Sequence, residues 1–246
     1  MTAGGLLLVH AFPLDARMWE AQVTHLETLV PVVAVNLPGF GGAPDAGRVM
    51  SMAAAADRCL LELDAAEVEA AVVCGLSMGG YVAFELWRRA RARIAGLVLA
   101  NTRAGADTPE GAEGRRALAE RLLAEGNGFL AESPPPLLSE GTPDHLRATV
   151  RRWIADQPAA SIAAAALGMA ERPDSTPDLP GIDVPTLVVT STRDTLIPPE
   201  VSSPMAEQIP GADLALIEGA GHLSSLEAPE TFEELVEGHL DRCGLL

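Results

Sequence analysis

The chain has 246 residues, a length that suits one α/β domain with an insertion, and its 48% hydrophobic and 21% charged residues are typical of a globular protein. The formal net charge of −17 argues against nucleic acid and anionic membrane surfaces as partners, because both attract a basic face. All 17 basic residues are arginine, which excludes Schiff-base, pyridoxal-phosphate and P-loop chemistry, since each of these requires a lysine.

The three cysteines, Cys59, Cys74 and Cys243, form no C-x-x-C pair. Neither a disulfide framework nor a structural zinc site is expected from so few, and free thiols are typical of the reducing cytoplasm. No apolar run approaches the ~18 residues that a membrane span needs. The start of the chain lacks a basic segment and is interpreted as a strand, not a signal peptide. We therefore expect a cytoplasmic protein that does not bind membranes.

Short β-branched runs alternate with helical patterns over most of the chain. Strands are predicted at 5–10, 30–37 and 70–76, and each is followed by a predicted helix, at 16–29, 51–65 and 78–91. A strand at 94–101 comes next, and strands at 185–191 and 212–219 follow much later, with helices near 199–208 and 228–241. These apolar strands lack strict alternation, which indicates a parallel sheet covered on both faces, with right-handed crossovers.

The alternation stops between 103 and 183. This part contains the cluster "ESPPPLLSEGTP" and helical patterns at 109–126, 143–156 and 159–171, without a strand pattern. We interpret it as a helical cap, inserted into an α/β core that consists of residues 1–102 and 184–246.

The stretch Gly75-Leu76-Ser77-Met78-Gly79 matches the G-x-S-x-G motif, and it lies where the motif requires, between a strand and a helix. Such a tight turn holds the serine in a strained backbone conformation, and the flanking glycines allow neighbouring backbone to pass closely. The hydroxyl then projects at the carboxyl end of the sheet, beside a helix N-terminus that favours negative charge. Ser77 is therefore the candidate nucleophile.

A nucleophilic serine requires a base, and the base requires an acid that orients it. His222 follows the strand at 212–219 in a glycine-bearing loop, and Asp194 follows the strand at 185–191. Both follow parallel strands, as Ser77 does, so all three are expected at one sheet edge, in the order Ser, Asp, His. Glu218 is the rival acid, but it would have to reach back across its own loop. Asn101 has no carboxylate.

The other histidines have other predicted roles. His25 and His239 fall in helical patterns beside charged residues and are expected on solvated faces, and His145 lies in the insertion. His10 is expected to bond loop backbone.

Acyl transfer also requires donors for the oxyanion. The backbone N–H of Met78, the residue after the nucleophile, is one candidate. The N–H of Phe12, in the loop "HAFPLD" after the first strand, is the other, because Pro13 makes that loop rigid.

Several segments resemble the α/β-hydrolase superfamily, and within it the small bacterial esterases and lactonases grouped around 3-oxoadipate enol-lactonase. They are "HAFPLDARMW", "NLPGFGGAP", "GLSMGG", "MAERPDSTPDL", "PTLVVTSTRDTLIPPE" and "IPGADLALIEGAGHLSSLEAPE". The resemblance implies an α/β-hydrolase fold, a Ser77–Asp194–His222 triad, oxyanion donors at Phe12 and Met78, and a helical cap at about 103–180.

Two departures from this group have structural consequences. Ala11 stands where the group usually has glycine, so its methyl group is expected to tilt the oxyanion loop. Only nine residues precede His10, where relatives usually carry two further strands. We therefore expect about six strands, with 30–37 at an exposed edge. A long apolar edge strand invites pairing, which predicts a homodimer through that edge.

The predicted function is that of a serine hydrolase that cleaves a carboxylic ester or lactone of a small molecule through an acyl-enzyme, without metal or organic cofactor. Carbon–carbon bond hydrolysis and perhydrolysis use the same triad and stay open. A non-catalytic ligand-binding protein of this fold is the other alternative, since fold and function are separable.

Overall fold

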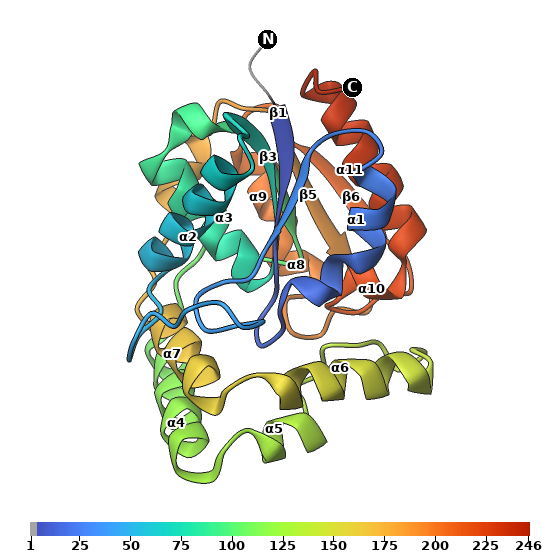
Figure 1. Cartoon of the computed structure of the whole chain (residues 1–246). Helices are drawn as coiled ribbons and strands as arrows, with labels where there is room; N and C mark the ends of the chain where they lie inside the picture. The colour runs from blue at the N-terminus through green and yellow to red at the C-terminus, as the bar shows by residue number, and fades with distance from the viewer. Residues whose placement is uncertain (1–3) are drawn as a thin grey trace.

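A sheet of six parallel strands lies at the centre of this computed structural model, which describes residues 4–246 (Figure 1). The strand order is β2-β1-β3-β4-β5-β6, and every neighbouring pair is parallel. The strands are β1 (Gly4–Val9), β2 (Val32–Val35), β3 (Ala70–Leu76), β4 (Ile94–Ala100), β5 (Thr186–Ser191) and β6 (Asp213–Ile217). The six predicted strands and their parallel arrangement are therefore confirmed.

The direction in which the chain crosses the sheet reverses between β1 and β3. From β1 the chain moves outward to the edge strand β2, and from β3 it moves the other way to β4. In open parallel sheets the carboxyl ends of two such strands leave a crevice between them, where ligands bind. The loops after β1 and β3 carry Phe12 and Ser77, so both lie at this crevice.

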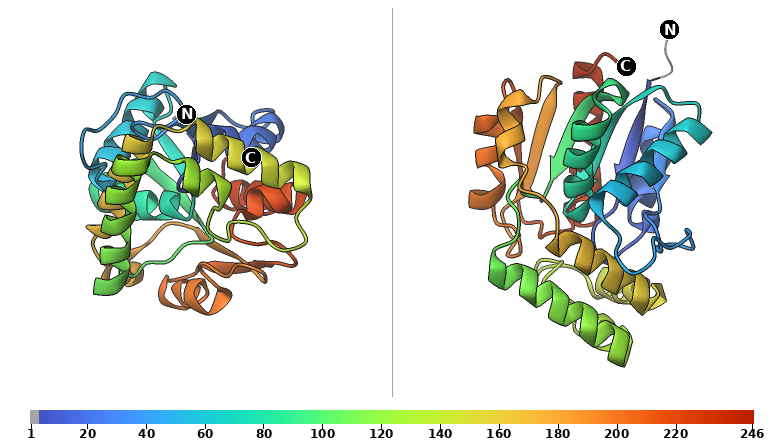
Figure 2. Two further views of the ribbon diagram at one scale, coloured as in Figure 1. Left: turned by 90° about the horizontal axis from the view of Figure 1, so that it is seen from below. Right: turned by 90° about the vertical axis from the view of Figure 1, so that its left-hand side faces the viewer.

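Helices cover both faces of the sheet. One layer contains α1 (Glu20–Leu26), which follows the 3-10 turn η1 (Ala16–Trp19), packed beside α11 (Pro229–Arg242). The opposite layer contains α2 (Met52–Ala65) packed beside α3 (Met78–Arg89) (Figures 1 and 2). The short elements η2 (Arg91–Arg93), α8 (Pro199–Ser202), α9 (Pro204–Gln208) and α10 (Ser224–Glu227) complete the core. The helix predicted at 199–208 is split in two at Ser203.

Four helices between β4 and β5 lie below the carboxyl ends of the strands (Figures 1 and 2). They are α4 (Pro109–Glu125), α5 (Gly128–Glu132), α6 (Asp144–Asp156) and α7 (Ala159–Ala170), and η3 (Thr176–Gly181) leads back to β5. Thr108 is the N-cap of α4: its side chain accepts the Gly111 N–H, and Pro109 occupies the first turn. We refer to residues 103–183 as the cap.

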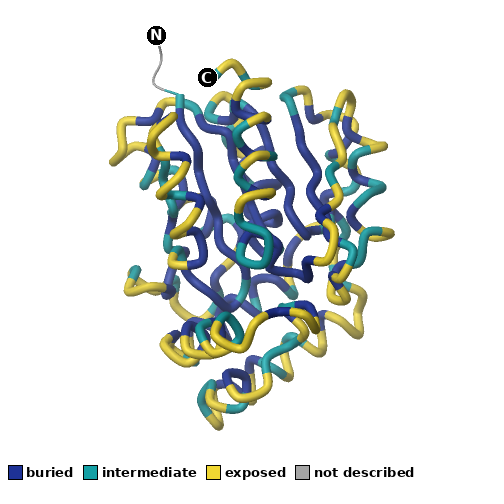
Figure 3. The backbone as a smooth tube through the Cα atoms, turned by 90° about the vertical axis from the view of Figure 1, so that its right-hand side faces the viewer, coloured by how far each residue is buried: buried dark blue, intermediate teal, exposed yellow. Residues whose placement is uncertain are grey.

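Burial decreases from the centre of the sheet to its edges (Figure 3). Five of the six residues of β1, and all those of β5, are buried. In β6, by contrast, Leu214 and Leu216 are each 50% exposed. Burial on both faces was expected for every strand. This was wrong for β6 and in part for β2, the two edge strands, and three of the four residues of β2 are only half-buried. No helix within residues 4–246 is long and apolar enough to cross a membrane.

Candidate active site

Ser77 forms the turn between β3 and α3 in a strained conformation. Its φ of 57° and ψ of −112° lie in the left-handed half of the map, which residues with a side chain rarely adopt. Three hydrogen bonds hold this turn: the Ser77 N–H donates to Ala100 O (2.9 Å), and its carbonyl accepts from Gly80 N (2.9 Å) and from the Thr102 hydroxyl (2.8 Å). The turn thus projects a half-buried Ser77 from the end of β3.

The glycines around Ser77 are required by close backbone contacts. A Cβ at Gly75 would collide with the carbonyl of Gly79, and a Cβ at Gly79 would collide with the carbonyl of Val9 at the end of β1. Gly79 therefore allows α3 to begin directly against the loop that carries Phe12. This close approach sets how near the two candidate oxyanion donors come to each other.

Gly79→Ala should lower the free energy of unfolding by about 3 kcal/mol, because α3 must move away from β1 or stay strained. Gly114→Ala is the matched control: Gly114 lies exposed within α4 with open space around it, so the change should stabilise the protein by about 0.8 kcal/mol. Urea unfolding of both variants measures the difference. Equal stability of the two variants would contradict the close approach.

His222 and Asp194 are joined directly. The His222 Nδ1 lies 2.8 Å from the Asp194 Oδ2, and both residues are buried, with 2% exposure each. Because a carboxylate can only accept, Nδ1 carries the proton and Nε2 is free to act as a base. The rival acid Glu218 is exposed on the loop after β6. The pairing therefore selects Asp194 over Glu218 as the partner of His222.

The Asp194 carboxylate is held in its charged form. Burial raises the pKa of this carboxyl, but hydrogen bonds from His222, the Ile197 N–H and Asn101 outweigh burial and bring its pKa below the ordinary 3.8. The Oδ1 also accepts the Leu196 N–H and the Ile197 N–H, both at 2.9 Å. A group with a depressed pKa stabilises the fold above its unfolded pKa and loses this contribution as the pH falls through the folded value. Asp194 is thus charged throughout the neutral range.

Ser77 is placed at the same sheet edge as this pair, but within residues 4–246 no hydrogen bond joins it to His222. Catalytic hydrogen bonds in free enzymes are commonly long and shorten only when substrate binds. The structure therefore brings together Asp194 and His222 directly, and Ser77 by its position at the end of β3.

Asn101 belongs to this site although it has no carboxylate, and it was not among the predicted site residues. It follows β4, is fully buried, and has a φ of 44°. Its amide nitrogen donates to the Asp194 Oδ2 (3.0 Å) and the Ser191 hydroxyl (2.6 Å), and its oxygen accepts from the Ser224 hydroxyl (2.6 Å). One amide thus orients the acid and, through Ser224, the loop that carries His222. Its position after a parallel strand was the only signal in the sequence.

The loop after β1 is fixed by His10, as expected. Its Nε2 accepts the Leu37 N–H (3.1 Å) and its Nδ1 donates to the Ala11 carbonyl (3.0 Å). Burial lowers the pKa of His10 to about 4, so the ring is neutral at pH 7. Ala11 is fully buried and has no positive φ, so this position does not require glycine.

The candidate oxyanion donors remain free of protein acceptors. Throughout the described part of the chain, neither the Phe12 N–H nor the Met78 N–H donates to another group. Met78 begins α3, where the first N–H groups have no partner within the helix. Both amides are therefore available to an oxygen bound next to Ser77.

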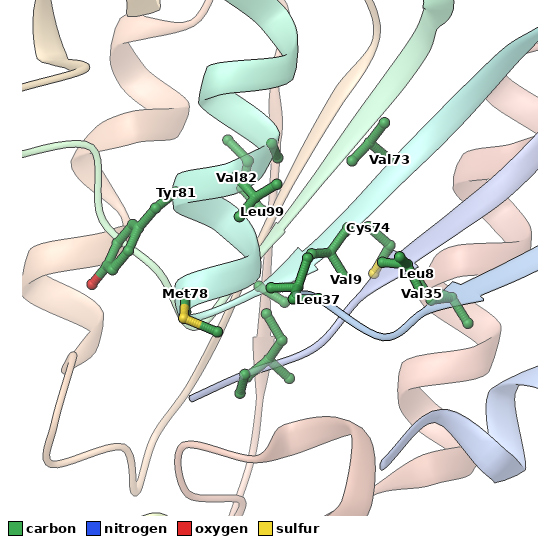
Figure 4. Packing of buried hydrophobic residues seen from close by; sticks show 14 of the residues in the cluster. Leu8, Val9, Val35, Leu37, Val73, Cys74, Met78, Tyr81, Val82 and Leu99 are labelled. Carbon is green, nitrogen blue, oxygen red and sulfur yellow. The ribbon is translucent and has the colours of Figure 1, made fainter. Parts of the chain in front are cut away.

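The remaining histidines and cysteines lie outside this arrangement. His25 is exposed beside Glu237 (3.0 Å), as expected, whereas His239 is buried, so its expected solvated position was wrong. The α11 face that carries His239 packs on the core, and burial lowers its pKa to about 4. Cys74 of β3 lies opposite Leu8 of β1 in the strand ladder, near the centre of the sheet (Figure 4). Burial raises the pKa of its thiol. Such a thiol is inert packing.

The chain is similar to known hydrolases over nearly its whole length. The sequence model of the alpha/beta hydrolase family matches residues 6–235. The chain is 30% identical to a pimeloyl-[acyl-carrier protein] methyl ester esterase of Neisseria meningitidis serogroup B, over 95% of this chain and 93% of that protein. It is 28% identical to 3-oxoadipate enol-lactonase 1 of Acinetobacter baylyi, over 96% of this chain and 88% of that protein. A solved thermophilic esterase from Thermogutta terrifontis superposes with a TM-score of 0.93 at 42% identity, over 98% and 92%.

Proposed function

Because the chain belongs to the alpha/beta hydrolase family, we propose that it is a serine hydrolase that cleaves a carboxylic ester or lactone of a small molecule. Its relatives of esterase and lactonase type support ester hydrolysis in general. The observation that carries the finer proposal is the buried hydrogen bond between Asp194 and His222, at the sheet edge where β3 ends in the strained Ser77.

In the proposed mechanism the Ser77 Oγ attacks the carbonyl carbon while His222 Nε2 takes the hydroxyl proton. Asp194 stabilises the imidazolium that forms, and the Phe12 and Met78 N–H groups donate to the oxyanion. His222 then gives its proton to the leaving alkoxide, which leaves an acyl-Ser77. A water that gives one proton to His222 Nε2 attacks this acyl group. Collapse of the second tetrahedral intermediate breaks the bond to Ser77 Oγ, His222 returns the proton to that oxygen, and the carboxylic acid is released.

The test is a panel of p-nitrophenyl esters of graded acyl length beside a panel of lactones. Turnover of an activated short-chain ester, retained in EDTA, would support a metal-independent hydrolase. The non-catalytic alternative predicts no turnover of any member and no labelling by a fluorophosphonate. Carbon–carbon bond hydrolysis or perhydrolysis by the same triad would be indicated if a substrate of either reaction were turned over with a higher kcat/KM than any ester.

The kcat/KM for this ester should fall as the pH is lowered from 8 to 5. His222 must be neutral to accept the Ser77 proton, whereas Asp194, with its depressed pKa, stays charged over the same range. A single acid limb is therefore expected. A flat profile between pH 5 and 8 would contradict His222 as the base.

We further propose that the protein acts in the cytoplasm as a homodimer that pairs through the edge strand β2. Its three thiols are free, which fits a reducing compartment. Strand β2 lies at the sheet edge with Val32 and Val33 half-buried, although it spans four residues where eight were expected.

Light scattering of the wild type should give a mass twice the chain mass of 25.6 kDa. The variant Val33→Arg should give the mass of a single chain. Leu214→Arg, on the opposite edge strand β6, is the matched control and should leave the dimer intact. A monomeric wild-type protein would exclude the dimer, and dissociation by Leu214→Arg alone would place the interface at β6.

A further inference from the structure

We propose that Glu227 is a positioning residue that couples the cap to the general base, by fixing cap segment 137–142 to the loop that carries His222. This inference rests on the proposed function, since it assigns His222 the role of base. Glu227 ends α10, five residues after His222, and its carboxylate is half-buried between the core and the cap.

The carboxylate of Glu227 accepts hydrogen bonds from both sides of this junction. From the cap it accepts the Ser139 N–H, 3.1 Å from each oxygen, and the Thr142 hydroxyl at 2.8 Å. From the base loop it accepts the Gly221 N–H at 3.1 Å. Gly221 directly precedes His222, so a single carboxylate ties the backbone beside the base to two residues of the cap.

Two further contacts hold the same surfaces together. The N–H of Leu223, the residue after His222, donates to the Leu137 carbonyl at 3.0 Å. A Cβ at Gly221 would lie 2.6 Å from the Ser139 nitrogen, so only glycine allows the cap backbone this close. His222 is therefore flanked by Leu223, whose N–H bonds the cap directly, and by Gly221, whose N–H is linked to the cap through Glu227.

Cap segment 137–142 is held in place by its neighbours in the cap. It follows three consecutive prolines, 134–136, whose fixed φ limits the conformations of the chain. On its other side Arg147 of α6 donates to the carbonyls of Ser139, Glu140 and Thr142. The prolines and Arg147 thus leave Glu227 attached to a stiff support.

A looser cap contact should therefore affect the chemistry as well as substrate entry. The Asp194–His222 hydrogen bond requires the loop at 221–224 to stay in place, and this loop is held from the core side by Ser191 and Asn101. Glu227 supplies the support from the cap side. Without it, the imidazole spends less time aligned with both Asp194 and Ser77, and both acylation and deacylation should slow.

The test compares Glu227→Ala, Glu227→Gln and Thr142→Val with Glu230→Ala, an exposed glutamate three residues further on. With p-nitrophenyl acetate, and with active sites counted by fluorophosphonate titration, Glu227→Ala should lower kcat 10- to 30-fold and change KM less than threefold. Glu227→Gln retains one acceptor oxygen and should recover part of the rate. Thr142→Val should lower kcat two- to fivefold, although it changes only the cap. Glu230→Ala should match the wild type.

Two readouts separate coupling from a purely structural role. The double variant Glu227→Ala, Thr142→Val should be no slower than Glu227→Ala, because both changes remove the same link. The low-field proton resonance of the Asp194–His222 hydrogen bond should broaden in Glu227→Ala at a temperature where the protein is fully folded.

An unchanged kcat per labelled site, or an unchanged resonance, in Glu227→Ala would overturn the coupling, even if the melting temperature falls. A wild-type protein that neither hydrolyses the ester nor reacts with the fluorophosphonate would overturn the proposed function instead, so the two failures are distinguishable.

Discussion

Ser77→Ala should reduce kcat for any ester substrate by about 10⁴- to 10⁶-fold, because the hydroxyl that forms the acyl-enzyme is gone. The fold should remain, since the turn is held by backbone bonds of Ser77 and by Thr102, which alanine keeps. Stopped assays at high enzyme concentration measure the residual rate, and a fluorophosphonate probe should label the wild type alone.

Two further variants, Ser77→Gly and Cys74→Ala, test the backbone strain at Ser77 and the role of the nearby thiol. Ser77→Gly should be equally inactive but more stable by about 1 kcal/mol, because glycine tolerates a φ of 57° without strain. Cys74→Ala should retain activity, since the thiol is buried in the sheet and reaches no reacting atom. Labelling that persists in Ser77→Ala would identify a different nucleophile.

Asp194→Asn should lower kcat about 10³- to 10⁴-fold while KM changes little. The Asn oxygen would accept the Leu196 and Ile197 N–H groups, which Asp194 Oδ1 accepts now. The amide nitrogen would then face His222 Nδ1, where Asp194 Oδ2 now accepts. His222 would respond with the opposite tautomer, whose protonated Nε2 cannot take the Ser77 proton.

Asp213→Asn provides the matched control for this change. Asp213 is an exposed partner of Arg242 on β6, so the same substitution there should leave kcat unchanged. A rate for Asp194→Asn within tenfold of the wild type would contradict Asp194 as the acid. Restored activity in Asp194→Glu, whose longer side chain still carries a charge, would favour charge over exact placement as the requirement.

The fold could be predicted well from the sequence because its signals are local. Strand β3 and the start of α3 were placed at the observed residues, since a β-branched run ends at Gly75-Leu76-Ser77-Met78-Gly79. The ends of β2 and of the helix after β1 were placed less well. There, the ladder between β1 and β2 covers only Val32–Val35, and η1 replaces the first helical turn, and these outcomes depend on neighbouring elements.

The candidate triad could be predicted for a related reason. Parallel strands deliver the residues that follow them to one sheet edge, so strand order alone brings Ser77, Asp194 and His222 to the same side of the molecule. The sequence already favoured Asp194 over Glu218, which would have to reach back across its own loop, and the structure agrees, with Asp194 bonded to His222 and Glu218 exposed. The tautomer of His222 follows only from that bond.

The sequence by itself determined the six parallel strands, the strained serine between β3 and α3, the order of the three candidate catalytic residues and the absence of lysine chemistry. All of these depend on residue type and on spacing within short windows. The tertiary structure decided the roles of Asn101 and Glu227 and the burial of His239. Asn101 and Ser224 are 123 residues apart, and Glu227 and Thr142 are 85 apart. Hydrogen bonds over such separations leave no periodic pattern, because they form only when segments far apart in the chain come together in the fold.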